Sequence, residues 1–130
     1  MKAQSFNGKS INDINHQLQE LLKDGFKPTI AFIFLSVSYD RKAIQDIFSE
    51  HNIQIFGVTT NGEFIDETLK KGTASVLLLD MNRDYFQIHL EHFTKKNYKK
   101  LAIDVATNAK SSFSHPAFLV SISHGETDGE

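Results

Sequence analysis

The chain has 130 residues, 40% of them hydrophobic, and carries 14 Lys and Arg against 16 Asp and Glu, a formal net charge of −2. This length and composition suit one globular domain with its own core. The sequence contains no arginine-rich patch, which argues against a dedicated nucleic-acid-binding protein, and we expect no nucleic-acid partner. It has no cysteine, which excludes disulfides, thiolate nucleophiles and cysteine-ligated zinc.

The apolar segments of the chain are short. The longest runs from Ile30 to Leu35, whereas a helix needs roughly 20 apolar residues to span a bilayer. The N-terminus also lacks the charged, apolar and small-residue order of a signal peptide. We therefore expect a cytoplasmic protein with no membrane partner.

The first third of the chain predicts one helix and one buried strand. Apolar residues recur at helical spacing over residues 11–24, with Ser10 placed to cap the start and Gly25 to end the helix. Residues 29–36 are apolar without alternation, which is typical of a strand covered on both faces. This strand is expected at the centre of a sheet.

The next helix and strand, together with the strand at residues 29–36, predict a parallel β-α-β unit. Asp40 is placed to cap a helix that ends at Glu50, and residues 53–60 form the next apolar strand. A helix between two strands of one sheet predicts a right-handed crossover, which makes the two strands parallel.

The second half predicts an antiparallel hairpin, a helix and a last strand. Residues 73–80 and 85–93 are separated only by residues 81–84, and so short a gap permits only antiparallel pairing. A third helix, ended by His115-Pro116, precedes an apolar strand at residues 117–123. The predicted fold class is α/β, in which a mixed sheet with a parallel βαβ unit and an antiparallel hairpin is flanked by about three helices in a single domain, residues 1–130.

The usual catalytic and metal-binding patterns are weak here. His89 and His92 are three positions apart on a predicted strand, so they point to opposite faces and cannot chelate one metal. His124, Asp128 and a serine offer the residue types of a hydrolytic triad, but no G-x-S-x-G motif is present. No P-loop or G-x-G-x-x-G motif follows the first strand. We predict no cofactor, no metal site and no assigned catalytic residue.

Polar residues gather where the predicted strands end. The segment Phe56–Phe64 runs from an apolar strand into hydroxyl and amide side chains between Gly57 and Gly62, followed by the carboxylate of Glu63, and the carboxyl ends of parallel strands are where α/β domains bind ligands. The same residues are also good turn formers, and Glu63 would then simply face solvent. The candidate ligand-binding residues are Ser36, Ser38, Thr59, Thr60, Asn61, Gly62, Glu63 and His124.

The order of these motifs resembles the N-terminal part of the FIST domain. The resemblance is carried by the strand ending in Phe34-Leu35-Ser36, the helix after Asp40, the segment Phe56–Phe64 and the strand Ser75–Leu79, and it covers roughly residues 28–125. FIST domains are regarded as intracellular sensory modules of bacterial signalling proteins, with amino acids as proposed ligands. The resemblance implies signal transduction through a small polar ligand, with a downstream signalling module or a C-terminal FIST part as partner.

Two other classes of function stay open. One is a small hydrolase or transferase with Glu63 or His124 as base, which needs a nucleophile that the sequence does not identify. The other is a protein-interaction module that acts through an exposed sheet edge. Because only seven residues follow the apolar strand 117–123, we also expect either further sequence after Glu130 or a homodimer that covers this strand.

Overall fold

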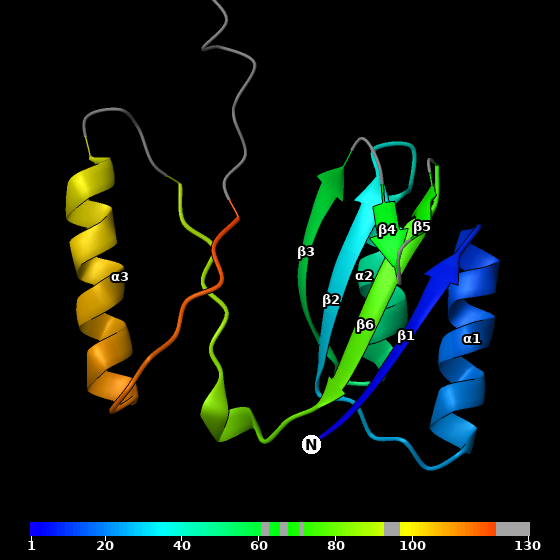
Figure 1. Cartoon of the computed structure of the whole chain (residues 1–130), viewed down its shortest axis with the longest axis horizontal. Helices are drawn as coiled ribbons and strands as arrows, with labels where there is room; N and C mark the ends of the chain where they lie inside the picture. Colours follow the sequence, from blue (N-terminus) through cyan, green and yellow to red (C-terminus); the bar gives the residue numbers. More distant parts are fainter. Residues whose placement is uncertain (61–62, 66–67, 71, 93–96, 122–130) are drawn as a thin grey trace, which may run out of the picture. The chain divides into compact units, whose positions relative to one another are not determined.

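A computed structural model describes residues 1–60, 63–65, 68–70, 72–92 and 97–121, with backbone alone for 63–65 and 68–70 (Figure 1). The chain divides into two compact units, Met1–Gln87 and Ile88–Glu130. The first contains β1 (Lys2–Gly8), α1 (Ile11–Lys23), β2 (Ile30–Ser36), α2 (Arg41–Glu50), β3 (Gln54–Thr60), β4 (Glu63–Ile65), β5 (Thr68–Lys70), β6 (Ala74–Asp80) and the 3-10 helix η1 (Arg83–Tyr85); the second contains α3 (Tyr98–Ser112).

The first unit is built on a mixed sheet of four strands in the order β1-β6-β2-β3. β2 and β3 are parallel, whereas β6 runs antiparallel to both of its neighbours, β1 and β2. β4 and β5 form a separate antiparallel hairpin. The predicted α/β fold class, a mixed sheet with a parallel βαβ unit and three helices, is therefore confirmed.

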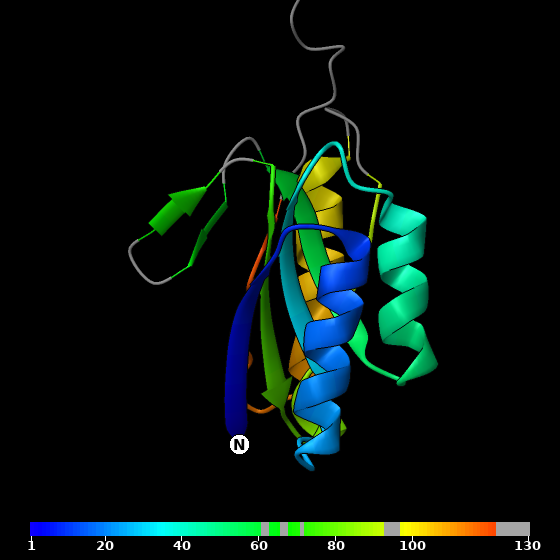
Figure 2. The same ribbon diagram turned by 90° about the vertical axis from the view of Figure 1, so that its right-hand side faces the viewer.

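Both predicted helices of the first unit begin at their predicted caps. The Ser10 hydroxyl accepts a hydrogen bond from the Asp13 amide at 3.1 Å, and Asp40 caps α2 in the same way. Each helix buries one face, through Ile14 and Leu18 in α1 and through Ile44 and Phe48 in α2. Figure 2 shows α1 and α2 side by side on one face of the sheet.

The hydrophobic core lies between these two helices and the sheet. Alternate residues of β2 and β6 point into it, and the strand register places Ile33 opposite Val76 and Ala31 opposite Leu78. Burial of this apolar surface is the main favourable contribution to the stability of the unit. The core residues are Phe6, Ile14, Leu18, Phe26, Ala31, Ile33, Leu35, Ile44, Phe48, Ile53, Ala74, Val76 and Leu78.

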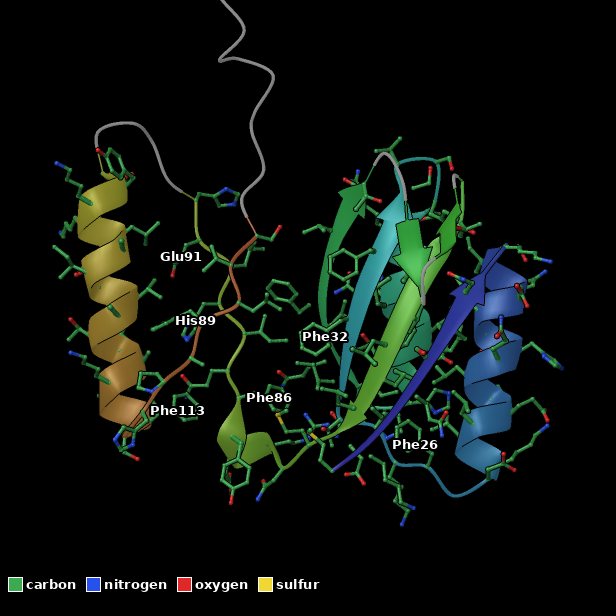
Figure 3. All side chains as sticks on the ribbon, in the orientation of Figure 1. Phe26, Phe32, Phe86, His89, Glu91 and Phe113 are labelled. Atoms are coloured by element: carbon green, nitrogen blue, oxygen red, sulfur yellow. The ribbon has the colours of Figure 1, made fainter. Side chains whose placement is uncertain are left out.

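The opposite side of the sheet, here called the second face, is also apolar. The register aligns Leu77, Phe32 and Phe56 across three strands, and Phe34 lies beside Val58 in the next row. The rings of Phe32 and Phe56 are tilted, with centroids 5.9 Å apart, and Figure 3 labels Phe32. Phe34 is 39% exposed and Leu77 38%. This explains why β2 shows no alternation of polar and apolar residues.

The predicted hairpin between residues 73–80 and 85–93 does not form. β6 is present, but Tyr85 belongs to η1 and residues 86–92 form no strand. The reason is that β6 already has β1 on one side and β2 on the other, so it has no free edge for a following strand. Leu90, within the expected second strand, is 88% exposed. The hairpin of this chain is instead β4–β5.

The second unit also differs from expectation. α3 forms, but none of its residues is buried, and it ends at Ser112, before His115-Pro116. Residues 117–121 were expected to begin a buried strand; they are exposed and form none, and residues 122–123 lie outside the described part of the chain. A strand requires a neighbouring strand for its backbone hydrogen bonds, and these residues have no such pairing in the structure. Among the described helices, none has the length and apolar character of a membrane span.

The position of the core predicts unequal effects of two phenylalanine truncations. Phe48 is fully buried under the sheet, so Phe48→Ala should lower the free energy of unfolding by about 3–5 kcal/mol. Phe34→Ala, on the second face, serves as the matched control and should cost less than half as much. Urea denaturation of both variants measures the difference. Equal losses would contradict a core confined to the helical side of the sheet.

Candidate functional site

The ends of the two parallel strands bring the predicted hydroxyl residues together. In the register of β2 and β3, Ser36 lies opposite Thr60 and Leu35 lies opposite Thr59. Ser36 and Thr59 therefore lie at the same end of the sheet, as the sequence predicts. Ser36 and Thr60 are half-buried, whereas Thr59 is exposed. Because side chains alternate along a strand, Ser36 and Thr60 share the second face and Thr59 points to the helical face.

Ser38 joins this group through the turn that follows β2. Its hydroxyl donates a hydrogen bond to the Ser36 hydroxyl at 3.1 Å. The backbone of the turn is held by two further bonds, from the Ser36 amide to the Thr73 carbonyl and from the Tyr39 amide to the Ser36 carbonyl, each 3.1 Å long. Serine hydroxyls held in this way keep donor and acceptor capacity for a ligand.

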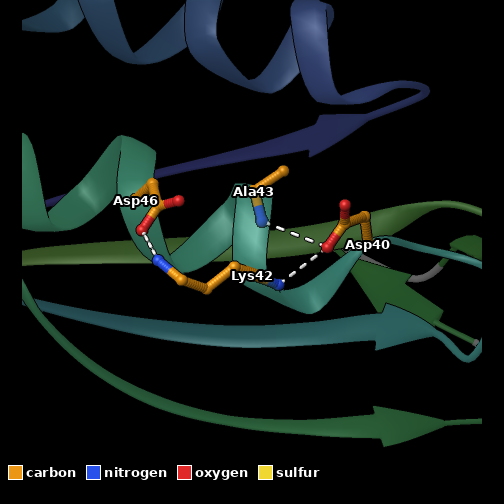
Figure 4. Close-up of polar contacts among 4 residues, drawn as sticks. All are labelled: Asp40, Lys42, Ala43 and Asp46. Atoms are coloured by element: carbon orange, nitrogen blue, oxygen red, sulfur yellow. Dashed lines mark hydrogen bonds and ion pairs between the residues drawn. The ribbon is translucent and has the colours of Figure 1, made fainter.

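The start of α2 is already occupied by Asp40. Its carboxylate accepts hydrogen bonds from the amides of Lys42 at 2.9 Å and Ala43 at 3.2 Å (Figure 4). Lys42 also forms an ion pair with Asp46 on the next turn of the helix. A helix N-terminus with free amides attracts anions, but here a side chain of the protein fills that role. The amides of Lys42 and Ala43 are therefore already engaged by Asp40.

The next strands in the chain after β3 are those of the β4–β5 hairpin. Glu63 is the first residue of β4 and pairs with Lys70 of β5. β4 lies close to β1, β2 and β6, and Figure 2 shows the hairpin on the side of the sheet away from the two helices. Asn61 and Gly62 lie outside the described residues, and for Glu63 only the backbone is described. The hairpin thus borders the same side of the sheet as Ser36 and Thr60.

A second polar pair, Asn7 and Ser75, was missed from the sequence. The Ser75 hydroxyl donates a hydrogen bond to the Asn7 side-chain oxygen at 2.9 Å, and Ser75 is only 5% exposed. Ser75 lies opposite Phe34 in the register, one step along the second face from Ser36. Asn7 comes from β1, which was not predicted, because Phe6 is the only large apolar residue of that strand. The polar end of the second face is therefore wider than the sequence indicates.

One predicted site residue, His124, cannot be placed. His124 lies outside the described residues, and the neighbouring segment 117–121 belongs to the second unit. Within the described part of the chain, no group of three His, Asp or Glu side chains is placed to hold a metal ion. The group that the structure brings together on the second face is Ser36, Ser38 and Thr60, with Asn7 and Ser75 beside it. Thr59 lies at the same end of the sheet but points to the helical face, so its predicted place in this group is not confirmed.

A shallow hollow between α1 and β1 is a different kind of surface. It has a volume of about 280 Å³ and is lined by Ser5, Phe6, His16, Gln17, Glu20, Leu21 and Asp24. Two of its polar side chains already have partners, since Gln17 donates to the Asn7 carbonyl at 2.9 Å and Glu20 pairs with Lys23 at 2.6 Å. The hydrogen bond and charge of Lys23 lower the pKa of the Glu20 carboxyl.

The role of Asp40 is testable by substitution. Asp40→Ala removes both capping bonds and should lower the free energy of unfolding by about 0.5–2 kcal/mol. Asp40→Asn keeps a capping oxygen and should lose much less, which makes it the matched control. Thermal unfolding without ligand measures both variants. If the two variants were equally stable, the cap would not hold the turn between β2 and α2.

Comparison with models of known protein families finds no match to this chain, and comparison with curated proteins finds none either. The resemblance to the FIST domain therefore rests on the residues that carry it in the sequence.

Proposed function

We propose that this chain is a cytoplasmic sensory domain of the FIST type that binds a small polar ligand in signal transduction. The observation that carries the proposal is the convergence of Ser36, Ser38 and Thr60 at the carboxyl ends of two parallel strands. Ligands of open α/β sheets bind in this position, outside the carboxyl ends of the strands. In this proposal, backbone amides of the residues that follow Thr60 in the sequence would also donate hydrogen bonds to the ligand.

The chemistry of these groups favours an amino acid as the ligand. Hydroxyls and backbone amides donate hydrogen bonds to a carboxylate without a charged partner. Asp40 is committed to the α2 amides, which leaves Glu63 as the proposed partner of the ligand's ammonium group. Such a site holds its ligand by hydrogen bonds at both ends.

Loss of one hydroxyl should abolish the response to ligand while leaving the fold intact. The hydrogen bond that Ser36 accepts from the Ser38 hydroxyl is on the surface, so Ser36→Ala should change the unliganded free energy of unfolding by about 1 kcal/mol or less. A ligand at 100 times its Kd stabilises a protein by about 2.7 kcal/mol, and this increment should largely disappear. A thermal-shift screen of amino acids and small metabolites measures both quantities.

The control for this experiment is Ser49→Ala, which removes an exposed serine on α2 and should keep the ligand response. The proposal fails if no compound in the screen stabilises the wild-type chain. It also fails if Ser36→Ala retains the full response. A large loss of unliganded stability would instead show that Ser36 is structural.

Substitution of Glu63 distinguishes binding of the ligand's ammonium group from binding of its carboxylate. If Glu63 receives the ammonium group, Glu63→Gln should weaken binding of an amino acid at least tenfold while changing little for the matching carboxylic acid without the amine. A difference of tenfold corresponds to about 1.4 kcal/mol, within the range of a hydrogen bond to a charged group. Calorimetric titration of the two compounds measures this difference. Equal weakening for both would remove Glu63 from that role.

A further inference from the structure

The sheet of the first unit has two edge strands, β1 and β3, and they differ in protection. Side chains of neighbouring elements reach the end of β1: Gln17 donates to the Asn7 carbonyl at 2.9 Å and the Tyr39 hydroxyl donates to the Gly8 carbonyl at 3.0 Å. The other end of β1 carries the charge of Lys2. Charges and covering side chains are the usual means by which edge strands avoid pairing with another chain.

In the part of the chain that the structure describes, β3 is less protected than β1. Its sequence, Gln-Ile-Phe-Gly-Val-Thr-Thr, contains neither a charged residue nor a proline, and within the described sheet β2 is its single neighbour. The Gln54 amide donates to the Thr29 carbonyl at 3.0 Å, so the backbone of Gln54 points toward β2. Because successive residues of a strand alternate in direction, the amides of Ile55, Gly57 and Thr59 point outward.

Gly57 stands at the middle of this outward row. A Cβ at this position would lie 2.8 Å from the Ile33 carbonyl oxygen and 3.3 Å from the Ile55 side chain, so only glycine fits beside β2. Both Gly57 and Thr59 are exposed. The centre of β3 is thus narrow and accessible, which suits close approach of another backbone.

We propose that β3 pairs antiparallel with β3 of a second copy of this chain, around a twofold axis at Gly57. In this arrangement the outward groups of Ile55 meet those of Thr59 in the second copy, and the two Gly57 residues meet each other. Every outward N–H and C=O of these residues then finds a partner. The inference goes beyond ligand binding and does not depend on it.

The side chains favour a second copy as the occupant. Around this axis Phe56 lies opposite Val58 of the second copy, and directly opposite aromatic and β-branched side chains stabilise antiparallel pairs. Both residues belong to the second face, where Phe56 already contacts Phe32. The two second faces therefore become one continuous apolar surface. No like charges meet, because Gln54–Thr60 carries none.

The cysteine-free sequence allows a selective cross-linking test. Chains carrying Phe56→Cys are mixed with chains carrying Val58→Cys under mild oxidation. Opposite residues that do not share hydrogen bonds have the closest side chains of an antiparallel pair, so the mixture should form disulfide dimers at least tenfold faster than either variant alone. The matched control at the protected edge, Ala3→Cys mixed with Ser5→Cys, should show no such preference.

Light scattering on the whole chain provides the second measurement. The wild type should have the mass of a dimer at micromolar concentration. Thr59→Pro removes an outward amide and should give a monomer with an unchanged circular dichroism spectrum, whereas Thr59→Ala keeps that amide and should stay dimeric. A monomeric wild type, or equal cross-linking in every mixture, would overturn the proposal. If Thr59→Pro does not fold, the cross-linking rates decide.

Discussion

The direction of the two crossover connections determines most of this structure. α1 connects β1 to β2, and α2 connects β2 to β3. In the sheet order β1-β6-β2-β3, both connections advance in the same direction across the sheet. Connections of one hand that advance in the same direction place their helices on the same face. α1 and α2 therefore cover one face together (Figure 2), which leaves the second face to the β4–β5 hairpin and to apolar side chains.

The same topology explains where polar groups collect. The carboxyl ends of β2 and β3 lie at the same end of the sheet. Ser36 and Thr60 are therefore neighbours, although they are far apart in sequence. β6 runs between β1 and β2 in the opposite direction and contributes Ser75 from its beginning. The polar end and the apolar middle of the second face thus arise from the same three strands. This change from polar side chains at one end to apolar side chains in the middle of the second face is the main chemical feature of the unit.

Local signals in the sequence were sufficient for the helices and the parallel strands. Ser10 and Asp40 are strong capping residues, and the apolar residues that follow them keep helical spacing, so the starts of α1 and α2 were predicted correctly. The hydroxyl residues of the site were found for a similar reason, because they directly follow two apolar strands. These features depend on neighbours in sequence.

The features that were missed depend on distant contacts. β1 carries one large apolar side chain, Phe6, and becomes a strand because β6 offers it an edge. Because β1 and β2 occupy both sides of β6, no following strand can pair with β6, so the short gap at residues 81–84 was misleading. The apolar residues 117–121 were assigned to a strand by composition alone. Asn7 was missed together with β1, and so was its pairing with Ser75.

The proposed ligand site lies where β2 and β3 end. NMR titration of the isotope-labelled chain with a stabilising amino acid tests this location, since each backbone amide reports its own surroundings. Binding at the strand ends should move the amide signals of Ser36, Ser38 and Thr60 and leave those of His16 and Asp24, at the hollow between α1 and β1, in place. Signals that move only at the hollow, with those of the strand ends unchanged, would exclude binding at the strand ends.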